Sequence, residues 1–210
     1  MEFIDKLDSS LTIGDDDYRD FITITIEEKL KNANSGLQAE GTEFLKTIGY
    51  LLELVHHIRT LPEGEEYDDE RTLGLTRLME IISKANRQDT YVRYVHQLAQ
   101  VHSKSKNFTE AAFALALHAD LIPFGDNILP AELHFPRQTA SARKEQLLNQ
   151  IVELLASNKF WESALVKSKQ MVEHCEKTSY DFKKVCVLDH FFFFFLPPQL
   201  FFFLVGLDLE

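Results

Sequence analysis

The sequence predicts an all-α fold, an antiparallel array of helical hairpins that resembles a helical-repeat protein. Three observations support this prediction. Apolar residues recur at steps of three and four along most of the 210-residue chain, as they do on one face of a helix. Short polar turns, or turns with Pro and Gly, separate these stretches, which favours antiparallel neighbouring helices. Only residues 22–26 alternate like a strand, and one short strand does not make a sheet.

The first half of the chain contains three clear periodic stretches. Residues 37–61 place their apolar side chains on one stripe, so we expect a long helix that ends at Pro62. The acidic run at residues 63–70 is then expected to be a solvated loop with no assigned role. Shorter helices are expected around the apolar stripes at residues 75–85 and 91–101. The alternating residues 22–26 leave two interpretations open, a strand or the entry to a helix that runs through Asn32.

The second half begins with a clear helix start. Asn107 and Glu110 have the spacing of a capping box, in which two side chains satisfy backbone N–H groups at a helix N-terminus. Residues 111–119 are apolar nearly all round, so this helix is expected to be buried on several sides. The prolines between residues 123 and 136 indicate a loop, and a fifth helix is expected to begin near Ser141. A sixth helix follows a turn at residues 157–159.

The expected sixth helix repeats a sequence feature of the helix that begins after Asn107. Phe108 precedes Ala111 by three residues just after a turn, and Trp161 precedes Ala164 in the same way. The small alanine lets two helices approach closely, and the aromatic ring fills the corner. Trp161 is therefore interpreted as a core residue rather than a binding hot spot. The two copies of this step lie 53 residues apart, whereas tetratricopeptide repeats have a period of 34 residues. The similarity therefore predicts two helical hairpins rather than a repeat array.

Composition divides the chain into three parts. Residues 1–36 are an acidic segment without a clear assignment, residues 37–185 are a helical lobe, and residues 186–210 are a Phe-rich tail. The tail could be a membrane anchor, but its 17-residue stretch, 191–207, is interrupted by Pro-Pro-Gln, so no intrinsic membrane span is expected. Phe, Leu and Pro share pyrimidine-only codons. We therefore interpret the tail as intronic or mis-predicted sequence rather than a folded domain.

The charge distribution excludes several classes of partner. The chain carries a formal net charge of −11, all of which falls in residues 1–80. A protein that binds nucleic acid gains its affinity by neutralising phosphates with basic side chains, so nucleic acid is not an expected partner. Docking on anionic lipid by charge is disfavoured for the same reason.

No constellation of residues points to catalysis, a metal or a cofactor. His56 and His57 are adjacent and face different sides of a helix, and His96 and His102 lack the spacing that holds a metal on one helix face. The glycines form no phosphate-binding loop, and acid pairs such as residues 65–66 lie in a solvated run. We therefore predict no catalytic, cofactor-binding or metal-binding residue and no cofactor.

The cysteines and the N-terminus indicate the compartment. Cys175 and Cys186 form neither a CxxC pair nor a disulfide framework, which favours a reducing, intracellular environment. The first residues lack the basic and apolar pattern of a secretory leader. A cytoplasmic location is expected.

Several motifs resemble a known family. Tyr-Val-Arg-Tyr at residues 91–94 is followed by Asn-Phe-Thr-Glu-Ala-Ala-Phe at 107–113 and Leu-His-Ala at 117–119. Downstream come Lys-Phe-Trp-Glu-Ser-Ala at 159–164 and Tyr-Asp-Phe at 180–182. In this order and spacing, the motifs are similar to the dedicator-of-cytokinesis (DOCK) family, and specifically to the first helical lobe of its second DOCK homology region.

The resemblance implies a function that the composition does not reveal. In the family, this region is a guanine-nucleotide exchange factor for Rho-type GTPases, chiefly Rac, and acts in small GTPase signalling. The first lobe braces the next one and contributes to homodimerisation, while later lobes bind the GTPase and expel the nucleotide. We therefore expect a non-catalytic part of an exchange factor, which meets its GTPase through lobes absent here and has a homodimer as an expected assembly. The alternative is a tetratricopeptide-like adaptor for protein partners, which would need a third hairpin at the same period.

Overall fold

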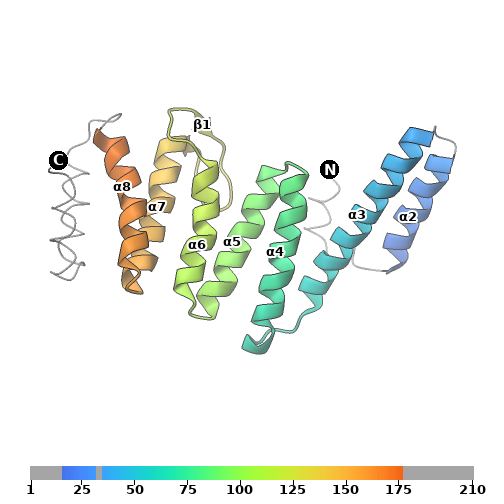
Figure 1. Ribbon diagram of the computed structural model, residues 1–210, viewed down its shortest axis with the longest axis horizontal. Coiled ribbons are helices and arrows are strands. Elements are labelled where there is room, and N and C mark those ends of the chain that lie inside the picture. Colours follow the sequence, from blue (N-terminus) through green and yellow to red (C-terminus); the bar gives the residue numbers. More distant parts are fainter. Residues whose placement is uncertain (1–15, 32–34, 177–210) are drawn as a thin grey trace. The chain divides into compact units, whose positions relative to one another are not determined.

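The computed structural model describes residues 16–31 and 35–176 (Figure 1). These residues are almost entirely helical, with one small pair of strands, which confirms the all-α prediction. The chain divides into two compact units, residues 1–94 and 95–210, and the boundary lies within α5. The elements are α2 (Asp16–Lys31), α3 (Ser35–Thr60), η2 (Glu65–Tyr67), α4 (Asp68–Lys84), α5 (Gln88–Lys104), α6 (Phe108–Leu121), β1 (Ile128–Leu129), β2 (Gln138–Thr139), α7 (Ala140–Ser157) and α8 (Trp161–His174).

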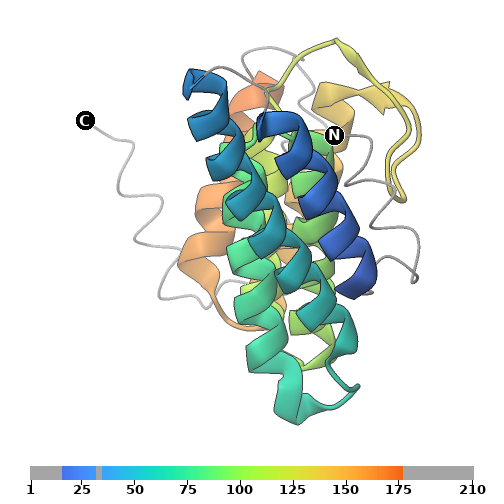
Figure 2. The ribbon, with the colours of Figure 1, turned by 90° about the vertical axis from the view of Figure 1, so that its right-hand side faces the viewer.

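In the first unit, α2 lies beside α3, as both views show (Figures 1 and 2). Residues 22–26 belong to α2, so the helical interpretation of this alternating segment is correct and the strand is not formed. The Thr25 hydroxyl donates a hydrogen bond of 2.7 Å to the carbonyl of Phe21, four residues back. This bond keeps the hydroxyl of a β-branched residue satisfied within the helix.

The long helix α3 packs against α4 through a core of leucines, isoleucine and methionine. Its predicted bounds, residues 37–61, agree with the structure to within two residues at each end. Gly74 on α4 is buried, and a Cβ atom at this position would lie only 2.8 Å from Cγ1 of Ile58. The glycine therefore permits the close approach of the two helices. The buried apolar residues of these two helices are Leu51, Leu52, Leu54, Leu75, Leu78, Met79 and Ile82.

The acidic run at residues 63–70 is not one loop, so that prediction is wrong in its second half. Residues 65–67 form the short 3-10 helix η2, and α4 begins at Asp68. The three acidic residues 68–70 occupy the first turn of α4, where the partial positive charge of the helix terminus favours carboxylates. Arg71 donates to Oδ1 of Asp68 at 2.9 Å and to the carbonyl of Pro62 at 2.8 Å, which ties the turn together.

In the second unit, α7 lies between α6 and α8 and packs on both (Figure 1). Helix α6 is buried on several sides, as predicted: half of its 14 residues are buried, and most of these are alanines. Small side chains let α7 approach closely, and α7 supplies the large ones. The buried apolar residues of α7 are Ala140, Leu147, Leu148, Ile151, Val152, Leu155 and Ala156.

Three helix–helix corners in the described chain close in the same way. Asn86, Lys106 and Lys159 each follow a helix and adopt positive φ, at 54°, 60° and 65°. The N–H of the next residue then bonds to a carbonyl five positions back, at 3.3, 2.8 and 2.9 Å, as in a Schellman motif. The residues after Lys106 and Lys159 also share a conformation, with φ of −85° and ψ of 63° and 61°. The sequence echo around Ala111 and Ala164 therefore reflects two similar corners, and both alanines are buried.

Two local predictions in this unit are wrong. Asn107 is the N-cap of α6, but its side chain makes no capping hydrogen bond, because its ψ of 63° lies far from the extended conformation that capping needs. Thr139 caps α7 instead, with ψ of 154°, and its hydroxyl accepts from the N–H of Ala142 at 3.2 Å. Trp161 begins α8 and is half-buried rather than a core residue, whereas Ala164 and Ser168 of the same helix are fully buried.

Some predictions concern residues outside the described ranges. These are the Phe-rich tail, Cys186, the Tyr-Asp-Phe motif at residues 180–182 and the first 15 residues. Within residues 16–31 and 35–176, no helix combines the length and apolar character needed to cross a bilayer.

Candidate functional site: a buried histidine and arginine cluster

Five side chains from three helices and one loop meet in the second unit, and three of them are buried. We call them the histidine–arginine cluster: His96 on α5, His118 on α6, His134 and Phe135 in the loop between α6 and α7, and Arg143 on α7. His118, Phe135 and Arg143 are each at most 2% exposed. Buried polar side chains need partners, so the contacts within this cluster determine what it does.

His96 and His118 are joined ring to ring. Nε2 of His96 lies 2.9 Å from Nδ1 of His118, and the rings meet edge to face with centroids 5.1 Å apart. One nitrogen must donate and the other must accept, so the contact requires at least one neutral ring. Phe135 lies against both rings at 5.9 and 5.8 Å, and His134 lies 5.5 Å from His96.

This environment favours the neutral histidines. Burial lowers the pKa of His96 to about 4, with a smaller contribution from the nearby charge of His134. Burial also lowers the pKa of His118 to about 4, assisted by the charges of His96, Arg143 and His134. Both rings are therefore uncharged near neutral pH, and the hydrogen bond between them is intact.

Arg143 fastens the loop between α6 and α7 to the helices. Its Nη2 donates to the carbonyls of Pro130 and Pro136, the second at 3.1 Å, and its Nη1 lies 3.4 Å from Oε2 of Glu132. The guanidinium carbon lies 5.5 Å from the centre of the Phe135 ring, a cation–π contact. One loop therefore wraps around a single buried cation, although Nε of Arg143 has no hydrogen-bond partner among the described residues.

The loop itself is held in a tight turn. Glu132 and Phe135 exchange two backbone hydrogen bonds, at 3.1 and 2.9 Å, and Leu133 between them adopts a φ of 53°. A positive φ is unfavourable for a leucine, so the surrounding contacts must maintain it. The same loop contains the short antiparallel pair β1–β2, in which Ile128 faces Thr139.

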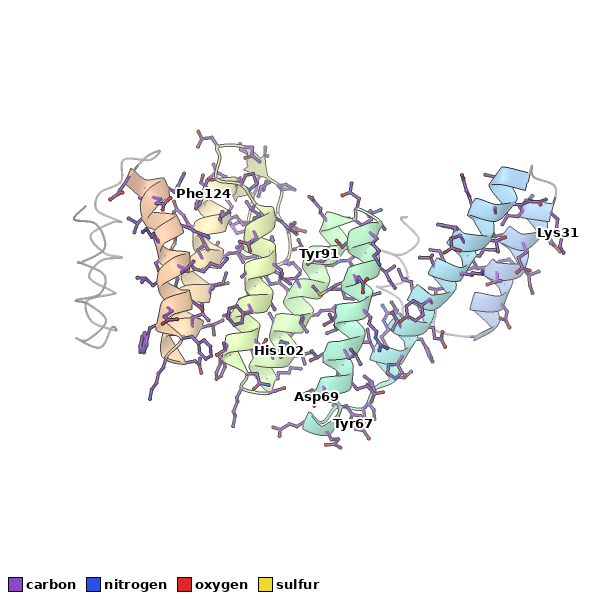
Figure 3. All side chains as sticks on the ribbon, viewed as in Figure 1. Lys31, Tyr67, Asp69, Tyr91, His102 and Phe124 are labelled. Carbon is purple, nitrogen blue, oxygen red and sulfur yellow. The ribbon has the colours of Figure 1, made fainter. Side chains whose placement is uncertain are left out.

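A second clamp holds the start of the loop. Phe124 stacks on His174 of α8 with ring centroids 4.0 Å apart and planes within 11° (Figure 3 labels Phe124). Nζ of Lys144 lies 4.8 Å from the centre of the Phe124 ring and donates to the carbonyl of Ile122 at 2.8 Å. Burial lowers the pKa of Lys144 below its usual value. The Ser141 hydroxyl also bonds both backbone groups of Gly125.

The contacts of the cluster connect one loop to three helices. His118 is buried and His96 half-buried, and these two histidines pair with each other, whereas His134 is exposed. Among the described residues, no group of three His, Cys, Asp or Glu side chains could hold a metal ion. What the arrangement does is fix the loop to α5, α6 and α7 through hydrogen bonds and ring contacts.

The sequence analysis missed most of this cluster. It considered His96 only together with His102, but His96 instead faces His118, which lies 22 residues away in the chain. Two signals were available: a histidine within the alanine-rich run of α6, and an arginine four residues before Leu147 on the buried stripe of α7. Neither signal identifies the partner, because the contacts are between distant segments.

The other residues weighed from the sequence lie apart. His56 is half-buried, while His57 is exposed and contacts Oε1 of Glu70 at 3.0 Å. Glu65 and Glu66 are exposed, and Cys175 is buried. None of these residues joins the histidine–arginine cluster.

Comparison with known proteins gives the family. A family model described as "DHR-2, Lobe A" matches residues 76–142, which include His96, His118, His134 and Phe135 and stop just before Arg143. Dedicator of cytokinesis protein 3 of Homo sapiens is 30% identical over 197 residues, which cover 88% of this chain and 10% of the relative. The chain belongs to the DOCK family.

Other relatives agree with this assignment. Dedicator of cytokinesis protein 4 of Homo sapiens is 29% identical over 187 residues, covering 88% of this chain and 9% of that protein. DOCK-like protein 1 of Saccharomyces cerevisiae is 28% identical over 142 residues, or 66% of this chain and 7% of the relative. The chain thus spans about a tenth of the length of the curated relatives it matches. The resemblance drawn from residues 91–119 is confirmed.

Proposed function

We propose that this chain is the first helical lobe of a guanine-nucleotide exchange factor for Rho- or Rac-type GTPases, and that it braces the exchange machinery without performing exchange. The match of residues 76–142 to DHR-2 lobe A carries the proposal. The lobe proper comprises residues 37–185, and the GTPase binds through other lobes. Nucleotide exchange requires groups that disturb the Mg²⁺ and phosphate contacts of the GTPase, whereas His118 and Arg143 of the histidine–arginine cluster are buried.

The packing of α6 supports the role of a brace. Its alanines are buried, yet Phe113, Leu117 and Leu121 are 42%, 40% and 40% exposed. These three side chains recur every four residues and so form one apolar stripe on the outer side of the helix. A stripe of this kind on a rigid helix suits contact with a neighbouring lobe or with a second copy of the chain.

A cytoplasmic location follows from the proposed partner, because Rho-type GTPases act on the cytoplasmic side of membranes. The chain has only two cysteines, too few for a disulfide framework, which supports a reducing compartment.

The exchange proposal is tested with a Rac-type GTPase loaded with a fluorescent GDP analogue. We expect the 210-residue chain to leave the release rate at its intrinsic value. Transcript sequencing across the codons of Val185 and Val187 should show a spliced message that replaces the Phe-rich tail, and its longer protein product should accelerate release. Acceleration by the 210-residue chain alone would contradict the proposed division of labour. A message that encodes the tail from ordinary exons would contradict the interpretation of residues 186–210.

The stripe on α6 is tested by light scattering after gel filtration. If it mediates homodimerisation, the mass of the wild-type chain should be twice that of the Leu117→Asp variant. The exposed Glu110 on the same helix provides a control, and Glu110→Gln should keep the wild-type mass. An unchanged mass for Leu117→Asp would show that the stripe does not mediate self-association and would leave contact with a neighbouring lobe as its role.

A further inference from the structure

The loop between α6 and α7 has a base and a tip that are held by different contacts. At the base, β1 pairs with β2, and Ile128 faces Thr139. Next to these strands, Ser141 and Gly125 are joined by hydrogen bonds of 2.9 to 3.1 Å. Residues 130–137, between the strands, form the tip, which we call the flap. Figure 1 shows the loop, labelled at β1, where α6 and α7 are connected.

The flap is pinned to the helices through the histidine–arginine cluster. Phe135 is 2% exposed, and its ring lies against the rings of His96 and His118. Arg143 donates hydrogen bonds to two backbone carbonyls of the flap and lies over the Phe135 ring. The closed position of the flap therefore depends on the state of this cluster.

We propose that the flap is an acid-sensitive switch, which opens about its β1–β2 base when His96 and His118 become protonated. Nε2 of His96 lies 2.9 Å from Nδ1 of His118, and this contact needs one nitrogen that accepts a hydrogen bond. An imidazolium ring has no acceptor, so the contact is lost when both rings are charged. Opening removes Phe135 from the two rings and lets water solvate their charge.

The charges around the two rings favour the open flap at low pH. The charged and titratable groups that face them are Arg143 on α7 and His134 of the flap, while Glu132 supplies a carboxylate that lies 3.4 Å from Nη1 of Arg143. In a closed flap, two imidazolium rings would therefore lie beside a guanidinium that already shares this carboxylate. Like charges in a partly buried site repel one another strongly.

The sign of the pH dependence follows from burial. It lowers the pKa of both His96 and His118 to about 4, and a ring that reaches water regains the ordinary pKa of 6.5. The open flap therefore binds more protons than the closed flap between these values. The closed flap is fully favoured above pH 6.5, and the equilibrium shifts toward the open flap as the pH falls toward 4.

Strain at the tip also favours opening. Leu133 has a φ of 53° at the first central position of the two-residue turn between Glu132 and Phe135, where glycine or asparagine is usual. Leu133 is 46% exposed, so burial offsets little of this cost. A short hairpin is only marginally stable by itself, so the turn is lost once the flap leaves the cluster. The N–H of Phe135, which donates to Glu132 at 2.9 Å, therefore reports opening.

Hydrogen exchange of the full 210-residue chain, measured by NMR between pH 7 and pH 5, tests the proposal. Each rate is divided by the intrinsic rate of that amide at the same pH, so that the opening equilibria are compared. We expect the protection of the Phe135 amide to fall about thirtyfold over this range.

Low concentrations of urea distinguish opening of the flap from unfolding of the whole unit. Urea accelerates exchange in proportion to the surface that an opening exposes, and the flap exposes little. At pH 5, urea should leave exchange at Phe135 unchanged and should accelerate exchange at Leu147, a residue of α7 that is 0% exposed. This comparison uses the wild-type chain and does not depend on any variant.

Two variants test the assignment to the histidine pair. In His96→Gln/His118→Gln, the protection of the Phe135 amide should change by less than about threefold between pH 7 and pH 5, because neither side chain titrates. The matched control is His102→Gln. His102 lies in the last turn of α5, outside the cluster (Figure 3), so this variant should keep the change of the wild type.

Four results would overturn the proposal. Equal urea dependence at Phe135 and Leu147 would show that acid unfolds the whole unit. Protection at Phe135 that does not vary with pH would show that the rings do not control the flap. A lost pH dependence in His102→Gln would place the titrating group outside the cluster. Parallel loss of protection at Ala140, whose N–H bonds to Asn127 at the base, would show that the entire loop moves.

Discussion

Helices α3 and α6 are both rich in apolar residues, but they use them differently. Half of the residues of α6 are buried, most of them alanines packed against α7. Along the 26 residues of α3, the buried apolar side chains are Leu51, Leu52 and Leu54, whereas Phe44 and Tyr50 remain exposed at a groove. Small side chains therefore produce a closed interface in the second unit, and large ones produce an open surface in the first. The comparison separates a helix that buries half of its residues from one that leaves large apolar side chains exposed at a groove.

The largest expected effect comes from removing the cation at the centre of the closed region. Arg143→Met should lower the free energy of unfolding by about 3 kcal/mol, because the carbonyls of Pro130 and Pro136 and the carboxylate of Glu132 lose their shared donor. Urea denaturation followed by circular dichroism measures this change. The exposed Arg137 in the same loop provides the control, and Arg137→Met should change stability by less than about 0.5 kcal/mol. Equal effects would mean that the loop is not fastened by Arg143.

Acidification should weaken the closed region next. The folded-state pKa values of His96 and His118, about 4, lie below the ordinary value of 6.5, so the unfolded chain binds more protons between these limits. Stability is therefore fully present above pH 6.5 and is lost as the pH falls toward 4. Because the two rings are coupled and His96 is half-buried, we expect a loss of about 2 kcal/mol between pH 7 and pH 5.

Two variants test the origin of this pH dependence. The double variant His96→Gln/His118→Gln should lose most of the slope between pH 7 and pH 5, whatever its stability at pH 7. On the open helix α3, His57 contacts Glu70 at 3.0 Å, but both side chains are about half exposed, so His57→Gln should keep the slope of the wild type. A slope that survives the double variant would place the titrating groups elsewhere.

Adding the same side chain to both helices tests the comparison directly. Ala119 on α6 is 0% exposed, so Ala119→Leu should overpack the interface and cost about 1.5 kcal/mol. Ala39 on α3 is exposed, and Ala39→Leu should change stability by less than about 0.5 kcal/mol, since leucine is nearly as good a helix former as alanine. Thermal denaturation of the two variants measures the difference. Similar losses would show that α3 is as tightly enclosed as α6.

The sequence predicts features that depend on neighbouring residues and misses those that depend on distant ones. Helical periodicity places α3 and α6 almost correctly, and the aromatic-x-x-Ala step identifies two corners that share a conformation. The contact between His96 and His118 could not be predicted, because spacing does not reveal which nitrogen atoms meet across two helices. The loop around Arg143 is held through backbone carbonyl groups. Every residue has such a group, so the sequence does not reveal which of them accept hydrogen bonds from Arg143.

Helix starts show the limit of local rules most clearly, and they give the smallest effect. Asn107 has the better capping sequence but makes no capping bond, whereas the hydroxyl of Thr139 accepts one from Ala142. Thr139→Ala should therefore cost about 1 kcal/mol, and Asn107→Ala should cost clearly less. Urea denaturation at pH 7 measures both under the same conditions. If Asn107→Ala were the more damaging of the two, the capping box would form in solution and the corner after Lys106 would differ from the corner after Lys159.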